Sequence, residues 1–378
     1  MRLCIDARPL QNGHRTRGVG VVVANLLPEM APLLRDQPVT LLTQQQADYP
    51  PYFASETRVK TFRLQRPNRC NWLADELLLP GLIRDSEADI FLATDFNSYL
   101  VPKGTTKVVA IAYDLIPFIF PEVMASQPWP VQLGWRVNFS KLRQADRVIA
   151  ISEATRTDLV RMFGLAPEQI QVIYPGIDHR LFNAAAGSDR ARRREILARY
   201  GISGRYLLYV GDSEWRKNLR RCLEALAGID PAVKLVLVGK RALTDNLLHG
   251  WIKELGLGDR VVLTGFVPDA ELPPLYGSAE AFLFPSLYEG FGLPVAEAMA
   301  CGCPVITSTV SSLPEVAGAA GLLVAPESVA EIREAMARIV ADAALRERMR
   351  EAGIRQAAPF SWARAASETV ALLREVAA

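Results

Sequence analysis

The sequence has almost no excess of either charge, few histidines and cysteines, and no long apolar run. Its 378 residues contain 43 Lys and Arg against 41 Asp and Glu, a formal net charge of +2. Proteins that bind nucleic acids carry a strong basic excess, so we expect no nucleic-acid partner. No apolar stretch reaches the ~20 residues that span a bilayer, and the first residues lack the apolar core of a signal peptide. These absences predict a cytoplasmic protein, while a peripheral contact with the inner face of a membrane stays open.

The five cysteines and three histidines are too few and too scattered for a disulfide framework or a metal centre. An odd number of dispersed thiols is typical of a reducing compartment. Cys301 and Cys303 have one residue between them, whereas zinc-binding pairs have wider spacing and need two further ligands. We therefore expect no metal site.

The sequence does contain alternating strand and helix patterns, in two successive blocks. Buried-strand patterns cover residues 3–7, 39–42, 90–93, 108–112 and 148–151, then 206–210, 233–238, 261–264, 281–284 and 304–307. Helical patterns lie between them, at 21–27, 218–227, 243–255, 270–276 and 294–300. Strands separated by helices predict parallel, doubly wound sheets, and the chain is too long for one ordinary core. We predict an α/β fold with two Rossmann-like domains that face a central cleft.

The domain boundaries are predicted from composition. The polar, charged segment 182–194 is typical of a connection between domains, and its basic run 190–195 is typical of a solvated helix face. Residues 361–376 have apolar residues at helical spacing behind a capping serine. We predict an N-terminal domain over residues 1–184, a C-terminal domain over 185–358 and a tail helix over 359–378.

The most informative segment has Glu289 and Glu297 on either side of Gly292 and Pro294. Pro294 fits the first turn of a helix, where its missing N–H costs nothing. The free amides and positive dipole end of a helix start bind anions. We expect Glu297 in the first helical turn and Glu289 in the loop before it. Amides for phosphate and carboxylates for hydroxyls suit a nucleotide sugar.

Two glycines precede the first predicted helix. Gly18 and Gly20 belong to the loop 15–20, and glycines let a backbone approach a ligand closely. The dinucleotide fingerprint needs a third glycine where Val23 stands and an acid after the second strand, so a nicotinamide cofactor fits poorly. The alternative interpretation is an ordinary surface loop.

Two cations follow the predicted strand 206–210. This strand runs into Gly211, and the loop behind it carries Arg216 and Lys217. Such groups neutralise a diphosphate, arginine through a planar fork and lysine as a point charge. A solvated loop is the alternative, but a position opposite the Gly292 helix start in the same domain favours a site.

A polar pair follows the predicted strand 108–112. Because Tyr113 and Asp114 come directly after this strand, they face the predicted cleft. Asp114 is then a candidate for orienting a sugar or a substrate hydroxyl. The alternative is an aspartate that caps the following turn.

Together these motifs resemble glycosyltransferase family 4, retaining enzymes of the GT-B fold. The similarity covers nearly the whole chain and is most specific in its C-terminal block. The matching segments are 18–20, 113–117, 172–178, 216–218, 289–306, 311–315 and 321–324. The stretch 113–122 is similar to bacterial mannosyltransferases of polysaccharide assembly. The resemblance implies that the tail helix crosses back to the N-terminal domain.

The resemblance also implies roles for individual residues. Glu289 holds hydroxyls of the donor sugar, Glu297 holds the ribose, and Lys217 with Arg216 neutralises the diphosphate. The further donor-binding residues that it implies are Gly18, Gly20, Gly211, Phe266, Val267, Phe291, Gly292 and Leu293. The role of Tyr113 stays open, because many members have a histidine at this position.

We predict an enzyme that transfers a hexose, first of all mannose, from a nucleotide diphosphate sugar to a hydroxyl of a glycan or lipid-linked acceptor. Transfer proceeds with retention and needs no metal or other cofactor. GDP-mannose is the first donor expected, and a UDP-hexose for glucosyl or galactosyl transfer is the second. A hydrolase with Glu289 and Glu297 as acid and base is an alternative, although one loop and helix place them awkwardly for it. A catalytically silent protein that binds sugar nucleotides is another.

Overall fold

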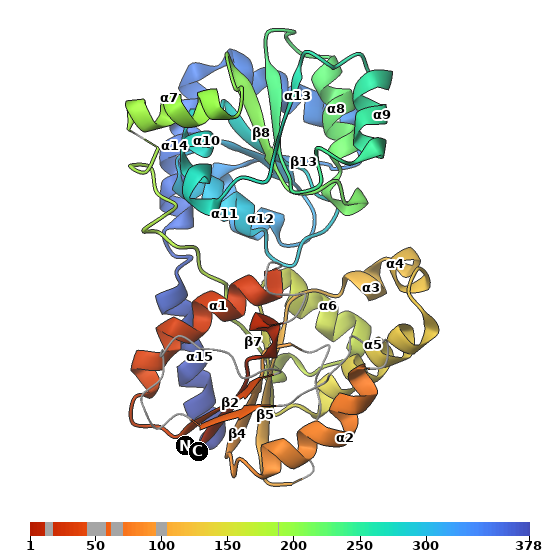
Figure 1. The fold of residues 1–378 in the computed structure, drawn as a ribbon, viewed down its shortest axis with the longest axis vertical. Helices are drawn as coiled ribbons and strands as arrows, with labels where there is room; N and C mark the ends of the chain where they lie inside the picture. Colours follow the sequence, from red (N-terminus) through yellow and green to blue (C-terminus); the bar gives the residue numbers. More distant parts are fainter. Residues whose placement is uncertain (12–17, 44–57, 62–70, 96–103, 188) are drawn as a thin grey trace. The chain divides into compact units, whose positions relative to one another are not determined.

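The computed structural model describes the chain except for residues 12–17, 44–57, 62–70, 96–103 and 188. The described chain forms two compact units (Figure 1). The first unit contains Met1–Gly176 together with Trp362–Ala378, and the second contains Ile177–Ser361. The tail helix is thus part of the first unit, and the first stretch of that unit ends before the expected boundary at residue 184.

The first unit is built on a parallel sheet of seven described strands, in the order β3-β2-β1-β4-β5-β6-β7. The strands are β1 (Leu3–Asp6), β2 (Val39–Thr43), β3 (Arg58–Thr61), β4 (Ile90–Ala93), β5 (Lys107–Ala112), β6 (Arg147–Ala150) and β7 (Ile170–Val172). The helices are α1 (Gly18–Met30), α2 (Asn71–Arg84), α3 (Ile116–Ile119), α4 (Pro121–Ala125), α5 (Trp129–Lys141), α6 (Glu153–Phe163) and α15 (Trp362–Ala377). In the centre, Leu3 of β1 lies opposite Val39 of β2 and Ile90 of β4. Helix α15 packs against α1 and approaches β4 and β5.

The second unit is built on a parallel sheet of six described strands, in the order β10-β9-β8-β11-β12-β13. The strands are β8 (Tyr206–Val210), β9 (Lys234–Val238), β10 (Val261–Gly265), β11 (Ala281–Phe284), β12 (Val305–Ser308) and β13 (Leu322–Val324). The helices are α7 (Arg190–Arg199), α8 (Leu219–Ala227), α9 (Asn246–Glu254), α10 (Leu272–Ser278), α11 (Leu293–Ala300), α12 (Leu313–Ala317), α13 (Val329–Ala341) and α14 (Ala343–Ala357). The order reverses between β8 and β11, so the carboxyl ends of these two strands flank the place where ligands bind in such sheets.

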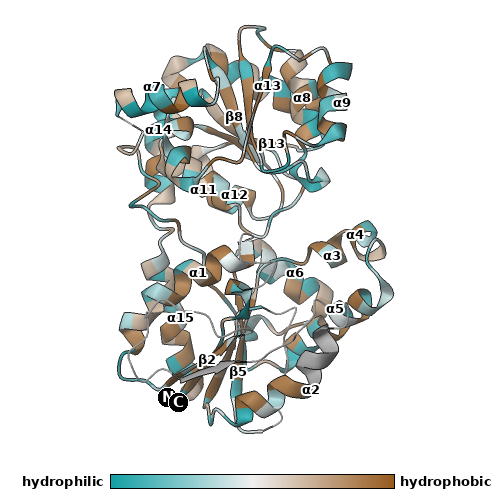
Figure 2. Cartoon of the chain, viewed as in Figure 1, coloured by the Kyte–Doolittle hydropathy of each residue, from teal (hydrophilic) through white to brown (hydrophobic). Residues whose placement is uncertain are grey.

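Apolar side chains explain why both sheets are buried. In Figure 2 the strands are largely brown, whereas the exposed helix α7 is mostly teal. Helix α8 places Leu219, Cys222, Leu223 and Leu226 at helical spacing, and all four are buried in the core of the second unit. No helix in the described parts of the chain is both long enough and apolar enough to cross a membrane.

Apolar runs predict the strands well and the helix ends less well. Each of the ten predicted strands is confirmed to within one residue at either end, while the short edge strands β3, β7 and β13 were not predicted. Helix α1 begins at Gly18, three residues before the predicted start. Helix α9 is shorter than predicted, because the Asp245 side chain accepts from the Leu247 and Leu248 amides and caps the helix there. Helix α7 begins at Arg190, inside the expected connection 182–194.

Candidate active site

The loop after β8 is shaped to bring a lysine back over the strand end. Gly211 has φ +150°, and a Cβ at this position would lie 3.0 Å from Cδ of Lys217. Residues Trp215–Lys217 form a single 3-10 turn, and Asn218 follows it with φ +62°. The side-chain amide of Asn218 donates to the carbonyls of Pro285 and Pro326, which fixes this unusual backbone. The aliphatic part of the Lys217 side chain therefore packs directly beside Gly211.

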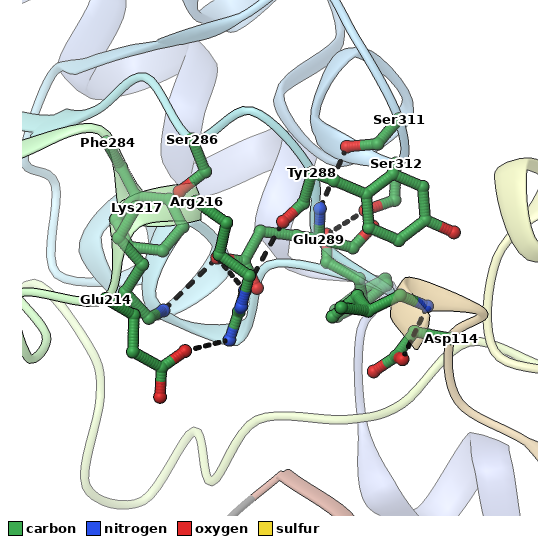
Figure 3. A network of polar contacts seen from close by, with 12 residues as sticks. Asp114, Glu214, Arg216, Lys217, Phe284, Ser286, Tyr288, Glu289, Ser311 and Ser312 are labelled. Atoms are coloured by element: carbon green, nitrogen blue, oxygen red, sulfur yellow. Dashed lines mark hydrogen bonds and ion pairs between the residues drawn. The ribbon is translucent and has the colours of Figure 1, made fainter. Parts of the chain in front are cut away.

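Arg216 and Lys217 both reach one carboxylate. Figure 3 shows the two side chains directed at Glu289, with Arg216 Nη1 at 2.9 Å and Lys217 Nζ at 3.1 Å from its Oε1. Arg216 also pairs with Glu214 at 3.0 Å, and Lys217 Nζ lies 4.7 Å from the centre of the Phe284 ring. The structure thus joins the two loops at the carboxyl ends of β8 and β11 through three charged groups.

Burial makes this charge cluster strong. The side chains of Glu289, Lys217 and Arg216 are 12%, 15% and 18% exposed. Burial alone would raise the pKa of Glu289, but the charges of Lys217 and Arg216 outweigh it and hold that pKa below its ordinary value. Glu289 is therefore a carboxylate at neutral pH, paired with both cations.

The backbone of the Glu289 loop is fixed by two serines. The Glu289 amide donates to Ser311 Oγ at 3.1 Å. The Ser312 hydroxyl lies 2.9 Å from the Glu289 carbonyl and 2.8 Å from the Phe291 carbonyl. The Leu287 amide donates to the Arg216 carbonyl at 2.7 Å. These bonds hold the loop in place ahead of any ligand, as a preorganised site requires.

Helix α11 begins immediately after this loop. Its N-terminal cap is Gly292, with φ +106°, and Pro294 lies in its first turn as predicted. The amides of a first helical turn can bind an anion, but here Pro294 has no N–H and the Val295 amide donates to the Gly292 carbonyl, so the candidate donor is the Leu293 amide. Phe291, whose ring packs edge-on against Phe360, and Gly292 are both buried at this helix start.

Gly292→Ala is expected to lower the free energy of unfolding by about 2 kcal/mol, because a side chain strains this left-handed backbone. An added Cβ would also lie only 2.7 Å from Cδ2 of Leu313. Urea unfolding measures the effect. Gly250→Ala is the matched control, since Gly250 is an exposed residue of α9. A Cβ added there would have no atom within 4 Å. That control should raise stability by about 0.5–1 kcal/mol, and a Gly292→Ala protein that behaves in the same way would contradict the argument.

The second glutamate is not where the sequence analysis placed it. Glu297 is the fifth residue of α11 and lies in the second turn, so the expectation of a first-turn position was wrong. The helix begins at Leu293, one residue before Pro294, and Glu297 is partly buried there. Burial and the charge of Asp269 raise the pKa of Glu297 from 4.5 to about 8. The two carboxyl groups of the motif therefore differ in charge at neutral pH.

Comparisons with known proteins agree with this geometry. Residues 16–181 match the family model described as Glycosyltransferase Family 4, and residues 193–356 match that of Glycosyl transferases group 1. The chain is 31% identical over 331 residues to O-antigen chain mannosyltransferase B of Escherichia coli, covering 82% of this chain and 78% of that protein. The chain belongs to glycosyltransferase family 4. It is also 33% identical to the MMP alpha-(1->4)-mannosyltransferase of Mycolicibacterium hassiacum, over 68% of this chain and 62% of that protein.

Solved structures show that this glycosyltransferase has the GT-B fold with two Rossmann-like domains. Sucrose-phosphate synthase from Thermosynechococcus elongatus has a TM-score of 0.79 at 23% identity, over 100% of this chain and 99% of that chain. Anabaena HepE in complex with UDP and glucose has a TM-score of 0.76 at 21% identity, over 99% of both chains. At these identities the likeness shows the fold alone.

In the first unit of the glycosyltransferase, Tyr113 and Asp114 follow β5 as the sequence indicates. Tyr113 is 4% exposed, and its hydroxyl donates to the Thr94 carbonyl at 2.8 Å. Burial and then the charges of Asp95 and Asp6 raise its pKa well above the ordinary value. Asp114 Oδ1 accepts from the Ile116 amide at 3.2 Å, the turn-capping arrangement that the sequence analysis held as its alternative.

The other predicted residues are distributed as follows. Gly18 and Gly20 lie in the first turn of α1, so the prediction of a loop position was wrong for these two glycines, and residues 15–17 of the predicted loop lie outside the described residues. After β10, Phe266 is 67% exposed and Val267 is buried. In the described ranges, no group of three or more His, Cys, Asp or Glu side chains converges as metal ligands do.

Two residues that influence the pKa of Glu297 are not indicated by the sequence. Asp269 lies in a 3-10 turn before α10, and Tyr276 lies on α10 itself. Asp269 raises the pKa of Glu297, and Tyr276 opposes this rise. The apolar run around Tyr276 predicts a buried aromatic ring, but nothing in the sequence indicates which carboxyl group lies beside it.

Proposed function

We propose that this glycosyltransferase moves mannose from GDP-mannose to a hydroxyl of a glycan or lipid-linked acceptor in the synthesis of a cell-surface polysaccharide. The observation that carries the proposal is the buried cluster of Arg216, Lys217 and Glu289 beside the start of α11. Two relatives whose names state mannosyl transfer support the choice of sugar. The name of the Escherichia coli relative also supports a polysaccharide as the product.

The cluster suits the departure of a nucleoside diphosphate. Arg216 and Lys217 neutralise charge that builds on the leaving phosphates, and the Leu293 amide adds a hydrogen bond to the same oxygens. Glu289 accepts hydrogen bonds from the donor sugar, and Glu297 accepts them from the ribose. Because protein cations supply the positive charge, the proposed reaction needs no metal. We further propose that Asp114 orients the acceptor hydroxyl and that the departing phosphate takes its proton.

We also propose that the sugar is transferred with retention of its anomeric configuration. Such a transfer does not use a water molecule held between two opposed carboxylates, which is what an inverting hydrolase requires. Glu289 is committed to two cations, which makes it a poor general acid. Analysis of the product by NMR tests the configuration directly.

A UDP-hexose is the second candidate donor, since Anabaena HepE, which has the same fold, binds UDP and glucose in its solved complex. Thermal unfolding with GDP, UDP, ADP and their mannose and glucose adducts separates the candidates. We expect GDP and GDP-mannose to stabilise most, by about 2.7 kcal/mol at 100 times the dissociation constant. The shift should survive an excess of EDTA. A clear preference for UDP would overturn the mannose assignment, and binding without release of nucleotide would indicate a silent protein.

A further inference from the structure

The hydroxyl of Tyr276 is buried without a hydrogen-bond partner. Within the described residues, three buried polar side-chain atoms have none: Tyr276 Oη, Ser286 Oγ and Arg350 Nε. Tyr276 is 0% exposed. Leaving such a group unsatisfied destabilises the folded state, so a phenylalanine would fit this core better if packing were its only purpose.

The position of this hydroxyl is fixed by its ring. The Tyr276 ring packs edge-on against Phe282, with centroids 5.3 Å apart, and against Phe182 at 6.4 Å. Helix α10, which carries Tyr276, packs against α11, which carries Glu297. Tyr276 is therefore a rigidly held phenol on the helix that packs against the helix carrying Glu297.

After burial itself, Glu297 is the group that raises the pKa of Tyr276 most. The titratable groups that surround the hydroxyl are Glu297 of α11, Cys301 and Cys303 beyond that helix, and Asp269 before α10. The charge of Arg350, on α14, opposes the rise that burial causes in the pKa of Cys303. The Tyr276 hydroxyl opposes the rise of the Glu297 pKa, although it makes no hydrogen bond of ordinary geometry. A hydroxyl that can donate to a carboxylate favours its charged form.

We propose that Tyr276 is a positioning residue for Glu297, and that its O–H donates to the Glu297 carboxylate when the ribose of a nucleotide binds to that carboxylate. The inference rests on the proposed function, in which Glu297 receives the ribose. A carboxylate accepts about four hydrogen bonds, so the ribose hydroxyls and the phenol can share it. The phenol holds the carboxylate in one orientation and lowers the cost of ionising it at neutral pH.

Tyr276→Phe tests the inference, because it removes the hydroxyl and keeps the ring. Titration calorimetry with GDP and UDP, which both contain ribose, gives the affinity from pH 6.5 to pH 10. We expect binding to weaken about tenfold near pH 7, the effect of one hydrogen bond to a charged group. The two proteins should converge at the highest pH, where Glu297 is ionised in both before the nucleotide binds. A purely structural role would give the same ratio at every pH.

Tyr206→Phe is the matched control. Tyr206 is 2% exposed, and its hydroxyl donates to the Leu275 carbonyl at 2.7 Å, so this variant loses an actual hydrogen bond. We expect it to be less stable but to bind both nucleotides within twofold of the unmodified protein. In a Glu297→Gln background, Tyr276→Phe should change the affinity by less than twofold, because the amide does not ionise.

The outcomes distinguish a wrong role for Tyr276 from a wrong proposed function. If the unmodified protein binds GDP or UDP and Tyr276→Phe behaves like Tyr206→Phe, the positioning role is wrong and the proposed function stands. An additional tenfold loss in the Glu297→Gln background would also overturn the role, since the hydroxyl would then act elsewhere. If the unmodified protein binds neither nucleotide, the proposed function fails and this inference fails with it.

Discussion

Glu289→Ala is expected to lower the rate of nucleotide release from the donor sugar about 10³-fold. The substitution removes the carboxylate that we propose to hold the sugar hydroxyls. It also removes the carboxylate oxygen that lies 2.9 Å from Arg216 and 3.1 Å from Lys217. The two cations then lose their common partner. Two buried cations would then repel each other and lose the geometry that a diphosphate needs. Release of GDP from GDP-mannose, followed with a coupled assay, measures the rate.

The same substitution should reduce the free energy of unfolding by about 3 kcal/mol, because breaking a buried pair leaves uncompensated charge. Activity must therefore be measured where the variant is fully folded, as shown by its circular dichroism. Glu289→Gln removes the charge and keeps the shape, and we expect it to lose activity almost as severely. A variant that keeps more than a tenth of the activity would end the assignment of Glu289.

Glu214→Ala is the control for this experiment. Glu214 pairs with the same guanidinium of Arg216 at 3.0 Å, but its side chain is 54% exposed. Exposed pairs contribute little, because water screens them. We expect activity within about threefold of the unmodified protein. If Glu214→Ala were as damaging as Glu289→Ala, the cluster would matter only as a support for Arg216.

The strand pattern and the charge cluster could be predicted from the sequence, for a common reason. Parallel strands buried on both faces read as continuous apolar runs, and their carboxyl ends meet at one edge of the sheet. Arg216 and Lys217 follow one such run and Glu289 follows another, so topology alone places them near each other. The edge strand β13 escaped prediction because it is three residues long and partly exposed.

The state of Glu297 could not be predicted, because it depends on contacts between distant segments. The start of α11 is set by the backbone of Gly292, which moves Glu297 to the second turn. Its neighbours Asp269 and Tyr276 come from residues before β11, and their spacing in the sequence gives no sign of the contact. Likewise, the Asp245 cap that shortens α9 is evident only once the helix has formed. Desolvation is a property of the assembled core rather than of any local motif.

Glu297→Gln is expected to stabilise the protein by an amount that grows with pH. Burial and Asp269 raise the pKa of Glu297 to about 8 in the folded state, against 4.5 for the ordinary group. Between these two values the folded protein binds more protons than the unfolded chain does. The stability of the unmodified protein must therefore fall as the pH rises through this window, and level off above it. A glutamine does not titrate, so the variant lacks this decline.

The difference in unfolding free energy between Glu297→Gln and the unmodified protein should grow by about 4 kcal/mol from pH 5 to pH 9. Other groups that titrate with pH, the buried cysteines included, are common to both proteins and cancel in the difference. Urea unfolding at half-unit steps of pH gives the curve. A difference that stays flat from pH 5 to pH 9 would mean that Glu297 is already ionised throughout. Glu297 would then bind the ribose without first losing a proton, and the Tyr276 hydroxyl would not be needed to favour its ionisation.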